Sequence, residues 1–246
     1  MELAATFSVG ARRVGIVSAL GVAALCPVYA TALVAGLLSL QTPQDPIGDP
    51  FFSVLEILIL LLAPLMVVLA AAMHAWASDA SKVYGLLSLV FMSLLAVITC
   101  SVHFVILTVS RDAAVAALPS ASLFLDFRWP SVVYALDILA WDIFFGLSVL
   151  FAARIFGGSR LANWIRGLLS VSGMLAIAGL SGVVSGNMQL RNIGIIGYVG
   201  VFPVAAALLA VLFIRTSPRP ASEGPGVAVA GIVPIRQRRS TLVIRR

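Results

Sequence analysis

Six side chains with the chemistry to bind or protonate a ligand lie inside long apolar stretches of this sequence. Two of them, Asp137 and Asp142, occur within the apolar run from Trp129 to Phe156. A carboxylate inside a bilayer costs roughly 2.5–3.5 kcal/mol on insertion scales, so it normally faces a protein interior or a water-filled cavity. The candidate ligand-binding residues are therefore Glu56, His103, Tyr134, Asp137, Trp141 and Asp142.

The spacing of the polar residues in Trp129–Phe156 predicts a helix with one polar face. At about 100° per residue, these residues fall within an arc of about 140°. The polar side comprises Ser131, Tyr134, Asp137, Trp141, Asp142 and Ser148, and the apolar side comprises Leu136, Leu139, Ile143, Leu147 and Leu150. We expect the polar side to face the centre of a helix bundle and the other helices to pack around it.

Three of the candidates lie at one depth. Glu56, His103 and Asp137 are each roughly 8–10 Å below the same membrane surface at 1.5 Å per residue, and Asp142 is about 7 Å deeper. We expect Glu56, His103 and Asp137 to line one cavity, with Tyr134 and Trp141 as its aromatic walls. Such a cavity could bind a cation, exchange protons, or act as acid and base on a ligand. A histidine there would make ligand binding depend on pH between about 5 and 8.

A structural role is the alternative for these groups, since they could satisfy one another. Asp137 could pair with His103, and Glu56 could bond to the backbone or to a serine. Other chemistries lack their signatures: the sequence has no metal-ligand pair such as H-x-x-x-H, no nucleophile elbow, no lysine inside a span and no glycine-rich nucleotide motif. The sequence therefore assigns no metal site, no catalytic residue and no cofactor.

The elements that must position these residues are membrane-spanning helices. The chain is 61% hydrophobic and 11% charged, with a mean hydropathy of +1.10, whereas soluble domains are about half apolar and a quarter charged. Its apolar runs reach the roughly 20 residues that a bilayer requires, and the alternation of β-strands is absent. We predict an all-α, polytopic bundle with six spans, at Val14–Leu40, Phe51–Ala77, Val83–Val109, Trp129–Phe156, Ala162–Ser185 and Ile193–Ile214.

The predicted organisation is a short N-terminus (1–13), a transmembrane domain (14–214) and a basic tail (215–246). The tail is rich in proline, glycine and arginine, and we expect it to be disordered and able to rest on anionic lipid. The two cysteines, Cys26 and Cys100, lie inside apolar runs and are expected to be buried thiols. The lipid bilayer is thus the expected partner, and the oligomeric state stays open.

The basic residues predict the orientation. The chain has 16 lysines and arginines, and with the N-terminus inside, all but Arg111, Arg128 and Arg191 lie on the cytoplasmic side. This is the bias of the positive-inside rule. We therefore expect a multi-pass protein of a bacterial inner (plasma) membrane with both termini in the cytoplasm. Because the arginines follow topology and form no soluble basic face, nucleic-acid binding is not expected despite the net charge of +6.

Two stretches carry a family resemblance. The entry Arg13-Val14-Gly15-Ile16 and the run Asp137–Leu180 resemble an uncharacterised bacterial family of six-helix integral membrane proteins, a domain of unknown function. The resemblance implies the six-helix fold. Because the family has no assigned activity, the resemblance gives no residue a role.

Three functions fit the sequence. The first is binding or transport of a small or lipophilic ligand in an acidic pocket of the outer half of the bundle, where Pro27, Pro64 and Pro203 could let the spans bend. The second is a membrane-embedded acid–base enzyme acting on a lipid or isoprenoid, with Asp137 and Glu56 or His103 as the reacting groups. The third is a structural or assembly subunit of a membrane complex.

Overall fold

The computed structural model describes residues 7–42, 45 and 47–217, and every regular element in this part of the chain is a helix. Six helical segments are long and apolar enough to cross a membrane, which confirms the predicted all-α fold class. They are Val9–Leu38, Phe51–Trp76, Asp79–Arg111, Val132–Ala153, Arg160–Ser185 and Met188–Arg215. The predicted basic tail lies outside the described residues from position 218 onward.

The first three spans are almost continuous helices. They are α1 (Val9–Leu38), α2 (Phe51–Trp76), and α3 (Lys82–Thr108) with the flanking 3₁₀ turns η1 (Asp79–Ser81) and η2 (Val109–Arg111). Two short helices follow, α4 (Ala113–Ala116) and α5 (Ala121–Leu125). Pro27 and Pro64 lie inside α1 and α2 without ending them.

The last three spans are built from shorter pieces. The fourth is α6 (Val132–Ile138), a π-helix η3 (Leu139–Phe145) and α7 (Gly146–Ala153). The fifth is α8 (Arg160–Ala178) and α9 (Ser181–Ser185). The sixth is a 3₁₀ turn η4 (Met188–Arg191), α10 (Asn192–Ile195), a π-helix η5 (Ile196–Val201) and α11 (Phe202–Arg215).

Serine caps determine where three of the helices begin. The Ser8 hydroxyl accepts a hydrogen bond from the Ala11 amide and starts α1 five residues before the predicted apolar span. Ser131 caps α6 and Ser159 caps α8 in the same way. A side-chain acceptor at this position satisfies an amide that has no partner within the helix.

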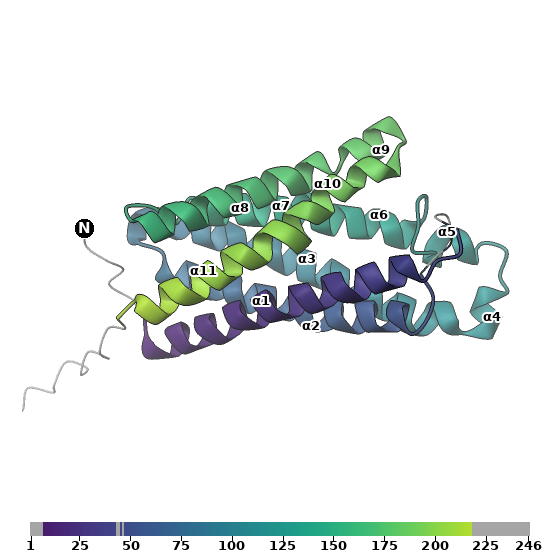
Figure 1. Cartoon of the computed structure of the whole chain (residues 1–246), viewed down its shortest axis with the longest axis horizontal. Helices are drawn as coiled ribbons and strands as arrows, with labels where there is room; N and C mark the ends of the chain where they lie inside the picture. The colour runs from purple at the N-terminus through teal and green to yellow at the C-terminus, as the bar shows by residue number, and fades with distance from the viewer. Residues whose placement is uncertain (1–6, 43–44, 46, 218–246) are drawn as a thin grey trace, which may run out of the picture.

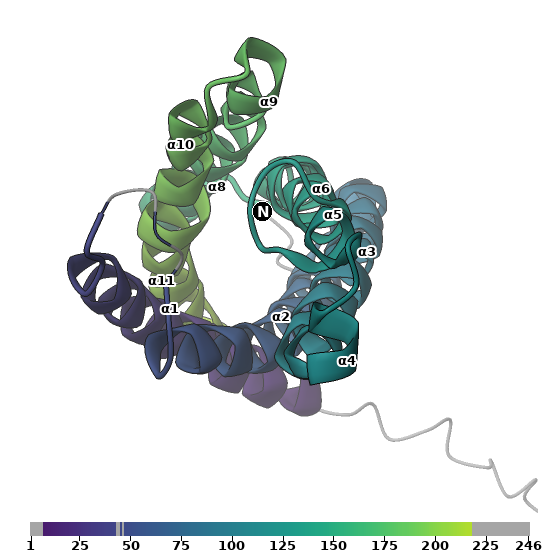
Figure 2. The same cartoon turned by 90° about the vertical axis from the view of Figure 1, so that its right-hand side faces the viewer.

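The six spans lie along one long axis (Figure 1), and their helices are arranged in a ring when viewed end-on (Figure 2). The first and last helices meet at one end. The Arg12 guanidinium donates to the backbone carbonyl oxygens of Phe213, at 2.9 Å, and Ile214, at 2.6 Å. The short helices α4, α5 and α9 lie at the opposite end (Figure 1).

The main apolar core fills the half of the bundle in which α1 begins and α11 ends. It includes fully buried side chains of α2, α3, α8 and α11, among them Met73, Met92, Leu169 and Phe213. Glycines let the helices approach closely there. A β-carbon on Gly173 of α8 would lie 2.8 Å from the Gly146 carbonyl oxygen, and one on Gly197 of η5 would lie 2.7 Å from the Ser172 carbonyl oxygen.

Two π-helical turns interrupt spans four and six at the inner edge of this core. Pro203 is the second residue after η5, and a proline lacks the N–H that would continue the α-helical pattern. Such turns often occur at functional sites. Here they contain Trp141 and Asp142 in η3 and Tyr198 in η5.

Candidate ligand-binding site

Glu56 of α2 and His103 of α3 form the first contact of a buried polar cluster. The His103 Nδ1 atom is 2.6 Å from Glu56 Oε2, and the two residues are only 3% and 2% exposed. For a structural role, the sequence analysis had suggested a backbone group or a serine as the hydrogen-bond partner of Glu56. Glu56 meets His103 because α2 packs closely against α3 and the two side chains lie at the same depth.

Asp137 of α6 lies on the other side of the same imidazole. Its Oδ1 atom is 3.5 Å from His103 Nε2, close enough for an ion pair, although Nε2 makes no hydrogen bond within the described structure. Its second oxygen, Oδ2, accepts a hydrogen bond of 2.7 Å from Arg191 Nη2. His103 therefore lies between two carboxylates.

Arg191 is a member of the cluster that the sequence analysis missed. It was counted among the basic residues outside the membrane, yet it is 5% exposed. The 3₁₀ turn η4 directs it inward, and its guanidinium lies 4.6 Å from the ring centre of Tyr134. One signal could have found it: a long arginine side chain just above a level of carboxylates can reach down to them from the helix end.

Asp142 completes the cluster behind Arg191. It is fully buried, and its Oδ2 atom is 3.5 Å from Arg191 Nε. Glycines make room for it, because a β-carbon on Gly194 would lie 2.9 Å from Asp142 Oδ1 and one on Gly179 would lie 3.3 Å from its Cγ. In an α-helix Asp142 would be rotated about 140° from Asp137. The π-turn brings residues five apart closer to one face, so both aspartates reach Arg191.

The cluster is a row of groups whose charges alternate when His103 is protonated: Glu56, His103, Asp137, Arg191 and Asp142. Pairing of this kind is what makes burial of charge tolerable in a low-dielectric interior. Hydrogen bonding is nevertheless incomplete. His103 Nε2, Arg191 Nε and both Asp142 carboxylate oxygens are buried without a hydrogen-bond partner among the described residues. The row therefore retains unused capacity to bind a polar group.

A cavity of about 870 Å³ opens beside this row, within the range of about 300–1,000 Å³ typical of ligand pockets. Glu56, His103, Tyr134, Asp137 and Trp141 line it, as do Arg191 and Tyr198. Asp142 does not. The glycines enclose it, and it approaches the cavity through Arg191.

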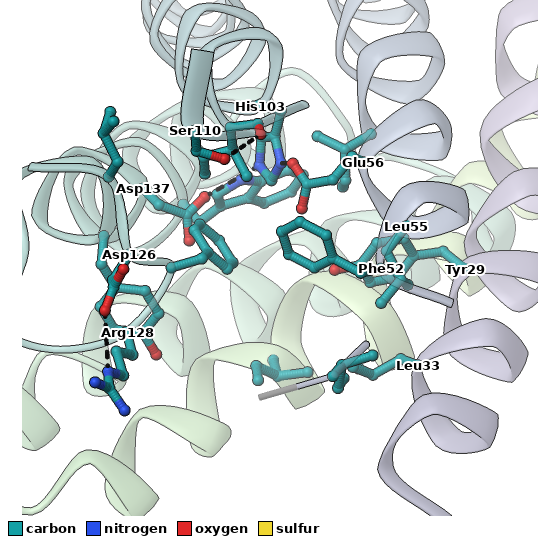
Figure 3. A pocket seen from close by; sticks show the side chains of 18 of the residues that line it. Tyr29, Leu33, Phe52, Leu55, Glu56, His103, Ser110, Asp126, Arg128 and Asp137 are labelled. Carbon is teal, nitrogen blue, oxygen red and sulfur yellow. Dashed lines mark hydrogen bonds and ion pairs between the residues drawn. The ribbon is translucent and has the colours of Figure 1, made fainter. Parts of the chain in front are cut away.

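The remaining walls of the cavity are largely apolar. Leu33 and Leu37 come from α1, Leu55 and Ile59 from α2, and Ile195 from α10. Figure 3 shows Glu56, His103 and Asp137 together on one side, with Phe52 between them and Leu33. The segment after α4 closes one end through Leu118, Leu125 and Phe127. The cavity thus has a charged side and an apolar side.

The described residues contain no group of three or more His, Cys, Asp or Glu side chains arranged to hold a metal ion. Comparison with known proteins adds no second line of evidence: no protein-family model, curated protein or solved structure matches this chain. The resemblance to the six-helix bacterial family therefore stays a prediction, and the function must be argued from the site itself.

Proposed function

We propose that this polytopic membrane protein binds an amphiphilic ligand, with the polar group against the Glu56–His103–Asp137–Arg191 row and the apolar part along α1 and α2. The observation that carries the proposal is the cavity of about 870 Å³ whose walls divide into a charged side and an apolar side. A ligand with the same division would satisfy both sides. Binding or transport is thus the first candidate.

The cost of the cluster supports a role beyond folding. Apolar side chains of similar volume can often replace a buried ion pair with no loss of stability, or with a gain. Ionisable residues inside a membrane bundle therefore suggest function. Two of the polar atoms of this cluster that lack a hydrogen-bond partner among the described residues, His103 Nε2 and Arg191 Nε, belong to residues that line the cavity. A cluster that served stability alone would have little need of a cavity beside it.

The bilayer is the natural source of such a ligand. Leu37 lines the cavity and is also 52% exposed on the outside of α1. Half-buried Ile195 and Val199 lie on the wall contributed by span six. The cavity wall thus reaches a surface that would face lipid, and a hydrocarbon chain could enter from the side without crossing water.

Two tryptophan substitutions on α1 test the proposal. Leu33 lines the cavity, so Leu33→Trp should fill it, whereas Val34 is exposed and does not line it, so Val34→Trp serves as the matched control. Each protein is purified in a mild detergent, and its retained lipids are extracted and identified by mass spectrometry. We expect a lipid in the wild type and in Val34→Trp that Leu33→Trp lacks. Identical lipid content in all three proteins would reject the cavity as the binding site.

A second candidate is acid–base catalysis on a lipid or isoprenoid. One observation favours it: Glu56 holds His103, which lines the cavity, through Nδ1, and this leaves Nε2 without a hydrogen-bond partner among the described residues. An oriented imidazole of this kind can take up or release a proton. Incubation of the retained lipid with wild type and His103→Gln distinguishes the two functions, because only an enzyme would change the ligand's mass.

We also propose that both termini are cytoplasmic and that the cavity lies in the outer half of an inner membrane. The contact of Arg12 with Phe213 and Ile214 joins the start of α1 to the end of α11, which supports one side of the membrane for both. Arg191 is engaged in the cluster, so the exposed basic residues at the cavity end are Arg111 and Arg128. The excess of basic residues at the other end favours that end as the cytoplasmic one.

A further inference from the structure

We propose that the ligand is a protonated amine carrying an apolar chain. This inference rests on the proposed ligand-binding function and adds the charge and hydrogen-bonding character of the polar group. The carboxylates that line the cavity are Asp45, Glu56, Asp126 and Asp137, and the basic side chains are His103, Arg128 and Arg191. The wall is therefore net negative whichever form the imidazole takes, and it disfavours an anionic headgroup.

Two of these carboxylates have no guanidinium partner. Asp137 pairs with Arg191 at 2.7 Å, and Asp126 pairs with Arg128 at 3.4 Å. The polar partner of Glu56 among the described residues is the His103 ring, and the side chain of Asp45 accepts a hydrogen bond from the Thr42 amide without forming an ion pair there. Glu56 and Asp45 therefore carry the negative charge of the wall that no guanidinium compensates.

His103 and Asp137 provide a place for an N–H donor. When neutral His103 donates from Nδ1 to Glu56, its Nε2 atom is an acceptor. This Nε2 atom makes no hydrogen bond to any described residue and lies 3.5 Å from Asp137 Oδ1, so two acceptors stand side by side in a residue pair that is almost completely buried. An ammonium group placed against both atoms could donate to each of them at once.

Aromatic rings around the cavity add to this preference. The rings that line it belong to Tyr29, Phe52, Phe127, Tyr134, Trp141 and Tyr198. Aromatic faces attract cations, most strongly where water is excluded. Arg191 already lies 4.6 Å from the ring centre of Tyr134, which is the same kind of contact. Phe52 lies beside the carboxylate of Glu56 (Figure 3), so a cation there would meet both a ring and a charge.

A set of ligands that differ only in the headgroup tests the inference. Radiolabelled dodecylamine, dodecanol and dodecanoate are titrated into protein in nanodiscs of neutral phosphatidylcholine, and uptake by empty nanodiscs is subtracted. We expect dodecylamine, which is protonated at neutral pH, to bind at least about tenfold more tightly than dodecanol, or about 1.4 kcal/mol. Dodecanoate should bind more weakly than both.

Charge variants locate the effect. Glu56→Gln keeps an acceptor for His103 and removes the charge, so we expect it to weaken dodecylamine binding much more than dodecanol binding and to abolish most of the preference for the amine. If Glu56→Gln does not fold, Asp45→Asn provides the test at a position outside the buried row, with a smaller loss in the same direction. Asp79→Asn, exposed at the opposite end of the bundle, is the control and should bind as wild type does.

The outcomes separate the two proposals. Dodecanol or dodecanoate binding as tightly as dodecylamine would overturn the assignment of an amine and leave the cavity as a binding site for amphiphiles. Saturable binding of none of the three ligands, or binding that Leu33→Trp does not reduce, would overturn the proposed function itself.

Discussion

Removing Arg191 should destabilise the protein strongly. In Arg191→Met, Asp137 would lose its hydrogen bond of 2.7 Å and Asp142 its ion pair of 3.5 Å, while both carboxylates remain buried. Breaking a buried pair by removing one partner typically costs about 3–5 kcal/mol. For a chain of this size, each kcal/mol lowers the melting temperature by about 2–4 °C, so we expect a decrease of about 6–20 °C.

The assay is thermal unfolding in detergent, with Arg128→Met as the matched control. Arg128 also pairs with an aspartate, but its side chain is 70% exposed and the distance is 3.4 Å. Exposed pairs contribute about 0–1 kcal/mol, so this variant should melt close to wild type. The double variant Arg191→Met/Asp137→Leu should recover much of the loss, because it no longer buries Asp137 as an unpaired charge.

Equal melting temperatures for Arg191→Met and Arg128→Met would refute the reasoning. They would mean that Arg191 does not hold the two aspartates in the folded protein. A double variant less stable than Arg191→Met alone would refute the account of Asp137 as the group left unpaired.

Three further predictions concern packing, orientation and titration. Gly194→Ala should lower the melting temperature, by a free energy of about 1–3 kcal/mol, because its β-carbon would lie 2.9 Å from Asp142 Oδ1; Gly167→Ala, with nothing within 4 Å, is the control. Phosphatase and fluorescent-protein fusions should place Lys82, Ser159 and Arg215 in the cytoplasm and Ser120 outside, and a periplasmic signal at Arg215 would overturn the orientation. The side-chain hydrogen bond from Ser53 lowers the pKa of Asp49, with Arg111 adding to the effect. The stabilisation from Asp49 is therefore present above its ordinary pKa of 3.8 and is lost as the pH falls below it. In an NMR titration, Ser53→Ala should raise the pKa of Asp49. An unchanged pKa would exclude this hydrogen bond as the cause of the lowered value.

Hydropathy was sufficient to predict the spans because bilayer length and backbone hydrogen bonding leave a helical membrane protein few choices. The ends of the helices were less predictable. The first helix begins at Val9 because Ser8 caps it. A prediction from the length of an apolar run takes no account of such a capping residue. The residues left between the fifth and sixth predicted spans, Gly186–Asn192, contain the 3₁₀ turn η4 and the start of α10.

Depth along the helices predicted part of the cluster. Glu56, His103 and Asp137 were placed at one level from the 1.5 Å rise alone, and the structure brings them together. Arg191 was missed because the count of basic residues treats each loop arginine as solvent-exposed. The position of Asp142 depends on a π-turn, whereas the sequence argument assumed the α-helical angle throughout.

The two π-turns have a mechanical consequence. The rings of Trp141 and Phe145 in η3 pack on Tyr198 in η5, with centres 5.0 and 5.9 Å apart. On one side of this contact the two spans pack in the apolar core, and on the other side they border the cavity. The two π-turns are therefore paired positions at which spans four and six can bend, coupled through the packed rings. Because Trp141 and Tyr198 also line the cavity, a bound ligand that displaces either ring would act on both π-turns together.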